Sequence, residues 1–174
     1  MFRETAELYE AYTLPYIASQ ATDRSLAWVY DCTEKRKETE RLLADDSDEG
    51  TGGFVINVDT KWSSHCSCLE VPKEDWRLHP ETNVNDLYCL GIVKEKGIRT
   101  LRDLKPHHIP LLLALQSTGL AAIRETYGVE ADQLRTFVHY VPQFFHLHVH
   151  FTRLWNDGGF PVRREGSPSR RLGR

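Results

Sequence analysis

The sequence predicts an α+β fold, in which antiparallel strands form a sheet and one long helix packs against it. Apolar residues recur at roughly helical spacing over residues 106–127, and Gly128 supplies a stop after them. Short segments rich in β-branched and aromatic residues indicate the strands. Strands around a single helix are typical of an antiparallel α+β sheet. The four strand candidates are residues 54–58, 87–93, 135–141 and 145–154.

The N-terminal part of the chain favours helices and a turn. Residues 4–20 are helix-prone, and Pro15 is expected to bend or end a first stretch because it lacks a backbone N–H. Residues 25–44 combine an aromatic segment with a charged run over residues 34–41, which suits a solvated helix face. Residues 45–53 are acidic and then glycine-rich, so they predict a turn before the first strand.

The remaining segments predict loops. Residues 63–85 are polar and are broken by Pro72 and Pro80, so they favour a loop. The last two strands are expected to join through Pro142 and the residue after it. Residues 156–174 are rich in Gly, Pro, Ser and Arg, a composition typical of disorder.

Composition excludes several classes of protein. The chain has 174 residues and a net charge of −3, and it contains no apolar run near the roughly 20 residues of a membrane span. Its first residues lack a signal-peptide pattern. Four cysteines without framework spacing favour a reducing compartment, so we expect a cytoplasmic or nuclear protein. Cys66 and Cys68 are too close for an ordinary zinc knuckle, and His65 beside them does not complete one.

The run His146-Leu147-His148-Val149-His150 is the strongest chemical signal. Because side chains alternate along a strand, the three imidazoles share one face and the two apolar residues take the other. Three neighbouring histidines are costly to bury unpaired and repel one another once protonated, which argues against simple packing. A metal site and nucleophilic catalysis by the middle imidazole are both compatible with this pattern.

The surroundings of the run bear on the choice between metal and nucleophile. A metal site usually adds a carboxylate or thiolate, but the nearest downstream acid, Asp157, lies in a Gly-rich stretch. The thiols of Cys66 and Cys68 lie far upstream. Neither interpretation is excluded by the run alone.

The run and its flanks resemble a known family. His146-x-His148-x-His150 followed by Phe151-Thr152 looks like a histidine triad motif, and colinear segments are similar to the scavenger mRNA decapping enzymes. The resemblance extends from about residue 2 to about residue 154. The segments that carry it are Arg3-Glu4-Thr5, Thr13-Leu14-Pro15, Trp28-Val29-Tyr30, Gly53-Phe54-Val55-Ile56, Asp59-x-Lys61-Trp62, the run from Gly97 to Leu104, and His139-Tyr140-Val141-Pro142.

The resemblance implies a histidine triad fold, a homodimer and a hydrolase of capped RNA fragments or cap dinucleotides. His148 would attack phosphorus, form a nucleotidyl-histidine intermediate and release 7-methylguanosine monophosphate. His146 and His150 would bind and orient the phosphates, and His139 would also line the phosphate site. The imidazoles would supply the donors around the phosphoryl oxygens, so no metal and no cofactor are expected, nor is a membrane partner.

The resemblance also implies the substrate contacts. Trp28 would stack on the cationic 7-methylguanine base, and Glu38 would accept hydrogen bonds from its edge. Asp59 and Lys61 match family residues near the cap, with Lys61 offering positive charge to phosphate. Gln143 stands where the family has serine, and its amide can donate to phosphate.

The expected domain organisation follows from this alignment of motifs. Residues 1–24 would form an N-terminal helical or hinge segment, residues 25–155 the catalytic domain with 63–85 as an inserted loop, and residues 156–174 a disordered basic tail. The chain would be the C-terminal catalytic domain of the family, truncated at both ends.

Two other functions stay open. Gln143 and Phe144 replace a Ser-Tyr pair of the family, and the chain is expected to lack the family's N-terminal domain; both points motivate a cap-binding relative without catalysis. Thr60 also replaces an apolar residue of the family that lies against the methylated base. A general histidine triad nucleotide hydrolase without cap preference is the third hypothesis.

Overall fold

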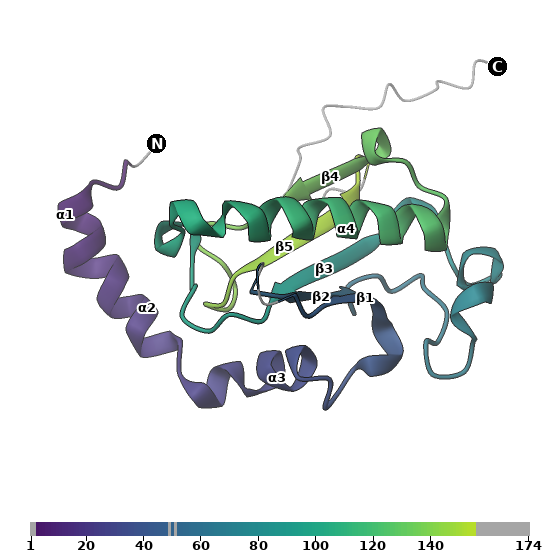
Figure 1. The fold of residues 1–174 in the computed structure, drawn as a ribbon, viewed down its shortest axis with the longest axis horizontal. Helices are drawn as coiled ribbons and strands as arrows, with labels where there is room; N and C mark the ends of the chain where they lie inside the picture. The colour runs from purple at the N-terminus through teal and green to yellow at the C-terminus, as the bar shows by residue number, and fades with distance from the viewer. Residues whose placement is uncertain (1–2, 49, 51, 156–174) are drawn as a thin grey trace, which may run out of the picture.

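An antiparallel sheet forms the centre of the computed structural model, which describes residues 3–48, 50 and 52–155. Within these residues the five strands lie in the order β1-β2-β3-β5-β4 (Figure 1). The helix α4, Ile109–Tyr127, lies across the sheet, so the predicted α+β class is confirmed. The strands are β1 Leu42–Asp46, β2 Phe54–Val58, β3 Tyr88–Val93, β4 Leu134–Phe137 and β5 His148–Arg153.

The helix α4 forms where the apolar pattern predicts it. A short 3-10 turn, Pro106–His108, precedes it, and Gly128 ends it in the left-handed conformation at φ 65°. A Cβ atom on Gly119 would lie 2.4 Å from Cζ of Phe151 on β5. The absence of a side chain at Gly119 therefore lets α4 approach the sheet closely.

The other face of the sheet meets a second helix. The helix α3, Asp23–Thr33, begins with a capping box in which Thr22 and Ser25 exchange hydrogen bonds. The buried residues of this smaller cluster come from α3, β2 and β3: Leu26, Val29, Cys32, Val55, Leu90 and Ile92. The cluster fixes α3 against the sheet and leaves part of this sheet face available for a cavity.

The predicted N-terminal helix is confirmed, with a π-helical interruption before the proline. The segment contains α1, Ala6–Leu8, a π-helical turn, Tyr9–Thr13, and α2, Leu14–Gln20. Pro15 lies in the first turn of α2, where a missing N–H is tolerated. Among the described residues, no helix is long and apolar enough to cross a membrane.

Two expectations for residues 34–53 are wrong. The charged run is not a helix: α3 ends at Thr33, Lys35 and Glu38 both have φ 57°, and only a 3-10 turn follows at Thr39–Arg41. This run has no apolar stripe with which a helix could pack against the sheet. The predicted turn starts too early, because Asp45 and Asp46 belong to β1, where they pair with β2.

The strands around the triad are shorter than predicted. β4 ends at Phe137, which pairs with His150, and β5 begins at His148 rather than at residue 145. After Phe137 the chain leaves the sheet, and residues 138–147 form the connection between β4 and β5. In the same connection, the Tyr140 hydroxyl donates to Glu4 at 2.5 Å, which ties it to the N-terminal segment.

The predicted loop over residues 63–85 contains no α-helix or strand, as expected. It holds two 3-10 turns, Lys73–Leu78 and Val84–Asp86, and the first of these packs against α4. Buried Trp76 anchors it. The division into segments 1–24 and 25–155 stays a prediction, and the predicted disordered tail, 156–174, lies outside the described residues.

Candidate active site

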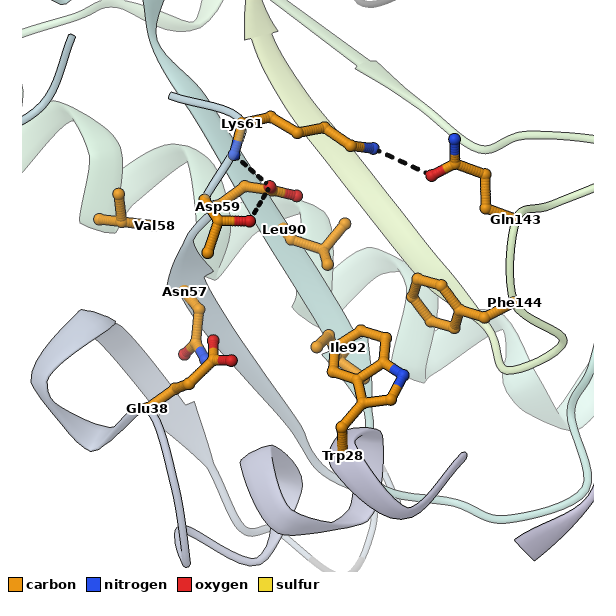
Figure 2. Close-up of a pocket in the computed structure, with 11 residues that line it drawn as sticks. Trp28, Glu38, Asn57, Val58, Asp59, Lys61, Leu90, Ile92, Gln143 and Phe144 are labelled. Atoms are coloured by element: carbon orange, nitrogen blue, oxygen red, sulfur yellow. Dashed lines mark hydrogen bonds between the residues drawn. The ribbon is translucent and has the colours of Figure 1, made fainter. Parts of the chain in front are cut away.

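A cavity of about 200 Å³ lies on the α3 side of the sheet (Figure 2). It brings together all five residues that the sequence assigned to substrate binding, although they lie up to 115 positions apart in the chain (143 − 28). The lining residues are Trp28, Glu38, Asn57, Val58, Asp59, Thr60, Lys61, Leu90, Ile92, Gln143 and Phe144. No residue of the 63–85 loop is among them.

Two segments that are far apart in the chain form one end of the cavity. Asp59 and Lys61 directly follow β2, and an Asp59 oxygen accepts the Lys61 backbone N–H at 2.8 Å. The Lys61 ammonium donates to Oε1 of Gln143 at 3.3 Å, as Figure 2 shows. This contact joins the end of β2 to the 138–147 connection and places a positive charge at one end of the cavity.

The rest of the cavity has an aromatic and an acidic side. Trp28 projects from α3 and keeps 40% of its surface exposed, and its ring forms a T-shaped pair with the Phe144 ring, with centroids 4.8 Å apart. Figure 2 shows Glu38 and Asn57 on the side away from Phe144. An accessible indole beside a carboxylate suits a cationic, hydrogen-bonding aromatic ligand.

Four histidine rings lie close to one another, and Phe144 from the lining of the cavity stacks on one of them. His148 and His150 lie on β5 with ring centroids 4.9 Å apart, and the His139 ring lies 4.4 Å from that of His150. His146 precedes the strand, and its Nε2–H donates to the backbone oxygen of Val93 at 2.7 Å. All three rings of the triad are buried.

His148 has the arrangement of a nucleophile. Its Nδ1–H donates to the backbone oxygen of His146 at 2.7 Å, so Nε2 carries the lone pair. Burial lowers the pKa of His148 to about 4, so the ring is neutral near pH 7. The ring also stacks on Phe144, with centroids 3.9 Å apart and planes 15° apart.

His150 has the arrangement of a donor to an anion. When the Tyr88 hydroxyl donates to its Nδ1 (3.0 Å), the ring proton lies on Nε2, which has no hydrogen-bond partner among the described residues. Burial raises the pKa of Tyr88 to about 12, so the hydroxyl keeps its proton. Burial lowers the pKa of His150 to about 3 and also lowers the pKa of His139.

Three residues of the site were not predicted to act there: Asn57, Tyr88 and Phe144. Asn57 is a carboxamide within an otherwise apolar strand, which is a signal that the sequence contains. The contacts of Tyr88 and Phe144 with histidine rings join separate elements, and no local pattern indicates them.

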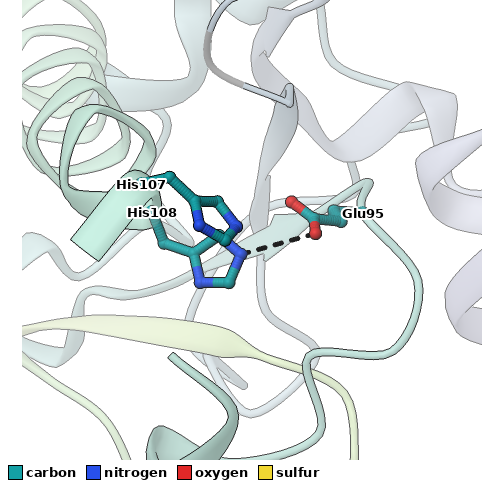
Figure 3. A group of neighbouring side chains, drawn as sticks. All are labelled: Glu95, His107 and His108. Carbon is teal, nitrogen blue, oxygen red and sulfur yellow. Dashed lines mark ion pairs between the residues drawn. The ribbon is translucent and has the colours of Figure 1, made fainter. Parts of the chain in front are cut away.

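Two other groups of metal-ligand residue types have structural contacts instead. At Glu95, His107 and His108 (Figure 3), the Lys105 N–H donates to Nδ1 of buried His108 at 2.9 Å. With Nδ1 accepting this bond, the ring proton lies on Nε2, which is 3.4 Å from a Glu95 oxygen without a hydrogen bond to it; neither nitrogen offers a free lone pair to a metal.

The second group is His65 with Cys66 and Cys68. Both nitrogens of His65 have partners, namely the Cys66 backbone oxygen at 2.7 Å and the Tyr127 hydroxyl at 2.8 Å. Burial raises the pKa of Cys68 to about 11, which disfavours the thiolate that a metal needs.

Comparisons with known proteins identify the family of the chain. The family described as "Scavenger mRNA decapping enzyme C-term binding" matches residues 27–164. A relative named m7GpppX diphosphatase from Rattus norvegicus is 38% identical over 154 residues, which are 88% of this chain and 40% of the relative. Relatives with the same name from Caenorhabditis elegans and Schizosaccharomyces pombe are 36% and 31% identical, over 90% and 91% of this chain and 44% and 46% of their own lengths. The chain thus spans less than half the length of these relatives and belongs to the scavenger mRNA decapping enzyme family, whose C-terminal domain it matches.

Proposed function

We propose that this chain hydrolyses the 5′–5′ triphosphate bridge of 7-methylguanosine cap dinucleotides or short capped RNA. The observation that carries the proposal is that Phe144, which lines the cavity together with Trp28 and Glu38, stacks on the ring of His148. Two floor residues of the cavity, Leu90 and Ile92, pair across the ladder with His150 and His148. The names of the relatives, m7GpppX diphosphatase, support the same substrate.

The cavity accounts for binding of the methylated base and the phosphates. Trp28 stacks on the cationic base, and the Glu38 carboxylate accepts from the guanine N–H groups. Asp59 holds the backbone of Lys61 in place, and the Lys61 ammonium and the Gln143 amide meet the phosphate oxygens. The base thereby places the adjacent phosphate beside His148.

The chemical step uses the lone pair on Nε2 of His148. The pair attacks the phosphorus attached to 7-methylguanosine, and the bond to the bridging oxygen breaks, with the electrons leaving on the nucleoside diphosphate. Water then attacks the nucleotidyl-histidine, releases 7-methylguanosine monophosphate and regenerates the ring. His146, through its backbone oxygen, holds the Nδ1–H throughout, and His139 and His150 orient the phosphates.

The first test is product analysis. Purified chain is incubated with methylated cap dinucleotide, and the products are separated by chromatography, with the unmethylated dinucleotide as the control. We expect 7-methylguanosine monophosphate from the methylated substrate and much slower cleavage of the control. Equal cleavage of both would instead support a general histidine triad nucleotide hydrolase.

A second candidate function is cap binding without turnover. The contact between Lys61 and Gln143 favours it. The Lys61 ammonium, which a phosphate would need, already donates a hydrogen bond to the Gln143 amide oxygen. Quenching of Trp28 fluorescence by the methylated dinucleotide without product would identify such a relative. The absence of both product and quenching would contradict both functions.

We also propose a homodimer that resides in the cytoplasm, the nucleus or both. Exposed apolar side chains on α4, Ile109 and Leu113, offer a surface for a second copy. All four cysteines are free thiols, which is typical of a reducing compartment. Light scattering of the purified chain and microscopy of a tagged chain test these two points.

A further inference from the structure

Asn57 is a polar residue in an apolar part of the sheet. It lies near the end of β2, and its partners on the neighbouring strands are Leu42 and Leu90. Only 5% of its surface is exposed. Val55, two residues earlier on the same face, belongs to the apolar cluster under α3. A leucine or isoleucine would be the ordinary residue at such a position.

The Asn57 side chain carries a buried hydrogen-bond acceptor. Its Oδ1 is buried and has no hydrogen-bond partner among the residues that the structure describes. Burying an acceptor without a donor costs free energy that an apolar side chain of similar size would not cost. The residue therefore weakens the fold where it stands, and a role in binding a ligand gives a reason for its presence.

The position of Asn57 identifies the kind of ligand. The residue lines the cavity beside Glu38, and Trp28 lines the same cavity (Figure 2). The edge of a guanine that faces Glu38 carries three N–H bonds, one on N1 and two on the 2-amino group. The two oxygens of one carboxylate accept two of them, so the third needs another acceptor.

We propose that Oδ1 of Asn57 accepts a hydrogen bond from the 2-amino group of the guanine that stacks on Trp28. A half-turn of the terminal amide exchanges its oxygen and nitrogen in space, so the acceptor can turn toward the base. Asn57 and Glu38 together then select guanine over purines that lack this amino group. The inference rests on the proposed function, since it assigns a second base contact in the same cavity.

The test is a comparison of two nucleotides and two proteins. Fluorescence quenching measures the Kd of 7-methyl-GMP and 7-methyl-IMP, which differ only in the 2-amino group, for the wild type and Asn57→Leu. We expect Asn57→Leu to weaken binding of 7-methyl-GMP about tenfold, the effect of one hydrogen bond in a desolvated site. Binding of 7-methyl-IMP should stay within about twofold, because it has no group for Oδ1 to accept from.

Controls separate this contact from a general effect on the cavity. Thr60→Val changes another polar lining residue and should alter the Kd of both nucleotides by the same factor. Asn57→Val, with a smaller side chain, repeats the test if leucine does not fit. In the absence of nucleotide, Asn57→Leu should unfold at a higher temperature than the wild type, which a purely structural role of the amide would not produce.

The outcomes distinguish the two proposals. Equal weakening of both nucleotides by Asn57→Leu, or no weakening of either, would overturn the contact with the 2-amino group. If the wild type cleaves the methylated cap while Asn57→Leu keeps full discrimination, only the inference about Asn57 fails. If the wild type binds neither nucleotide, the guanine contact and the proposed function fail together.

Discussion

At the scale of single residues, the two nitrogens of His148 have different tasks. Nδ1 donates to the backbone of His146, which leaves the lone pair on Nε2, the atom that we propose attacks phosphorus. We expect His148→Asn to abolish release of 7-methylguanosine monophosphate while the Kd of the cap stays within a few fold, because the nucleophile acts mainly in the transition state. Chromatography and fluorescence quenching measure the two quantities. Normal turnover by this variant would show that another atom attacks.

The low pKa of His148 predicts how activity and stability depend on pH. The ring keeps its lone pair down to a pKa of about 4, so the rate should fall near pH 4 and not near 6.5. The unfolded ring, with its ordinary pKa of 6.5, binds more protons between these values. Its contribution to the free energy of unfolding is therefore present above pH 6.5 and is lost as the pH falls to about 4. The rate as a function of pH measures the first effect, and urea denaturation at several pH values measures the second. A rate that halves near pH 6.5 would contradict the low pKa of the His148 nucleophile.

Trp28 is expected to supply much of the affinity for the base. Trp28→Ala should weaken cap binding by about 1–3 kcal/mol, the scale for stacking a base on an aromatic ring. Trp28→Phe is the matched control, since it keeps an aromatic face and should lose less. Isothermal titration calorimetry measures the Kd of the cap for both variants, because neither keeps the Trp28 indole whose fluorescence the cap would quench. An affinity unchanged by Trp28→Ala would exclude the stacking role.

The sequence predicted part of this site. Trp28, Glu38 and Lys61 were found through a resemblance of motifs, and the structure places them around one cavity. Asn57 and Phe144 were not predicted to act, because their importance depends on what lies across the ladder or against a neighbouring ring. Such neighbours follow from tertiary packing and not from local spacing.

At the scale of elements, the close approach of α4 to β5 decides the effect of a small substitution. In Gly119→Ala the gain in helix propensity, roughly 1 kcal/mol, opposes a new contact with the buried Phe151 ring. Overpacking typically costs about 1–3 kcal/mol, so we expect a net loss of stability. Urea denaturation measures it, and Ser117→Ala on the exposed side of α4 is the control, which should change little. A more stable Gly119→Ala protein would show that Phe151 moves aside freely.

Elements with a strong local pattern were predicted best. β2, β3 and α4 have continuous or periodic apolar residues, and their predicted and observed bounds agree closely. β1 was missed because its acidic end has low strand propensity and is held by pairing with β2. The charged run after α3 was assigned to a helix because its polarity fits a helix surface, although it has no apolar stripe.

At the scale of the whole molecule, the two faces of the sheet have different tasks. The larger core lies between the sheet and α4, and the smaller cluster under α3 borders the cavity and the histidines. Substitutions on the α4 face should therefore act on stability, and those on the α3 face on binding. Because side chains alternate between the two faces along each strand, neighbouring residues can differ in role: Ile56 packs in the core under α4, and Asn57 lines the cavity.

The hydrogen bond between Lys61 and Gln143 makes entry of a ligand an exchange of partners. A neutral base can reach Trp28 and leave this bond intact. A phosphate must compete with the amide oxygen for the Lys61 ammonium, and each added negative charge on the ligand makes that competition easier. Under the proposed function, the cavity would therefore select ligands twice, by the shape and charge of the base at one end and by the number of phosphates at the other.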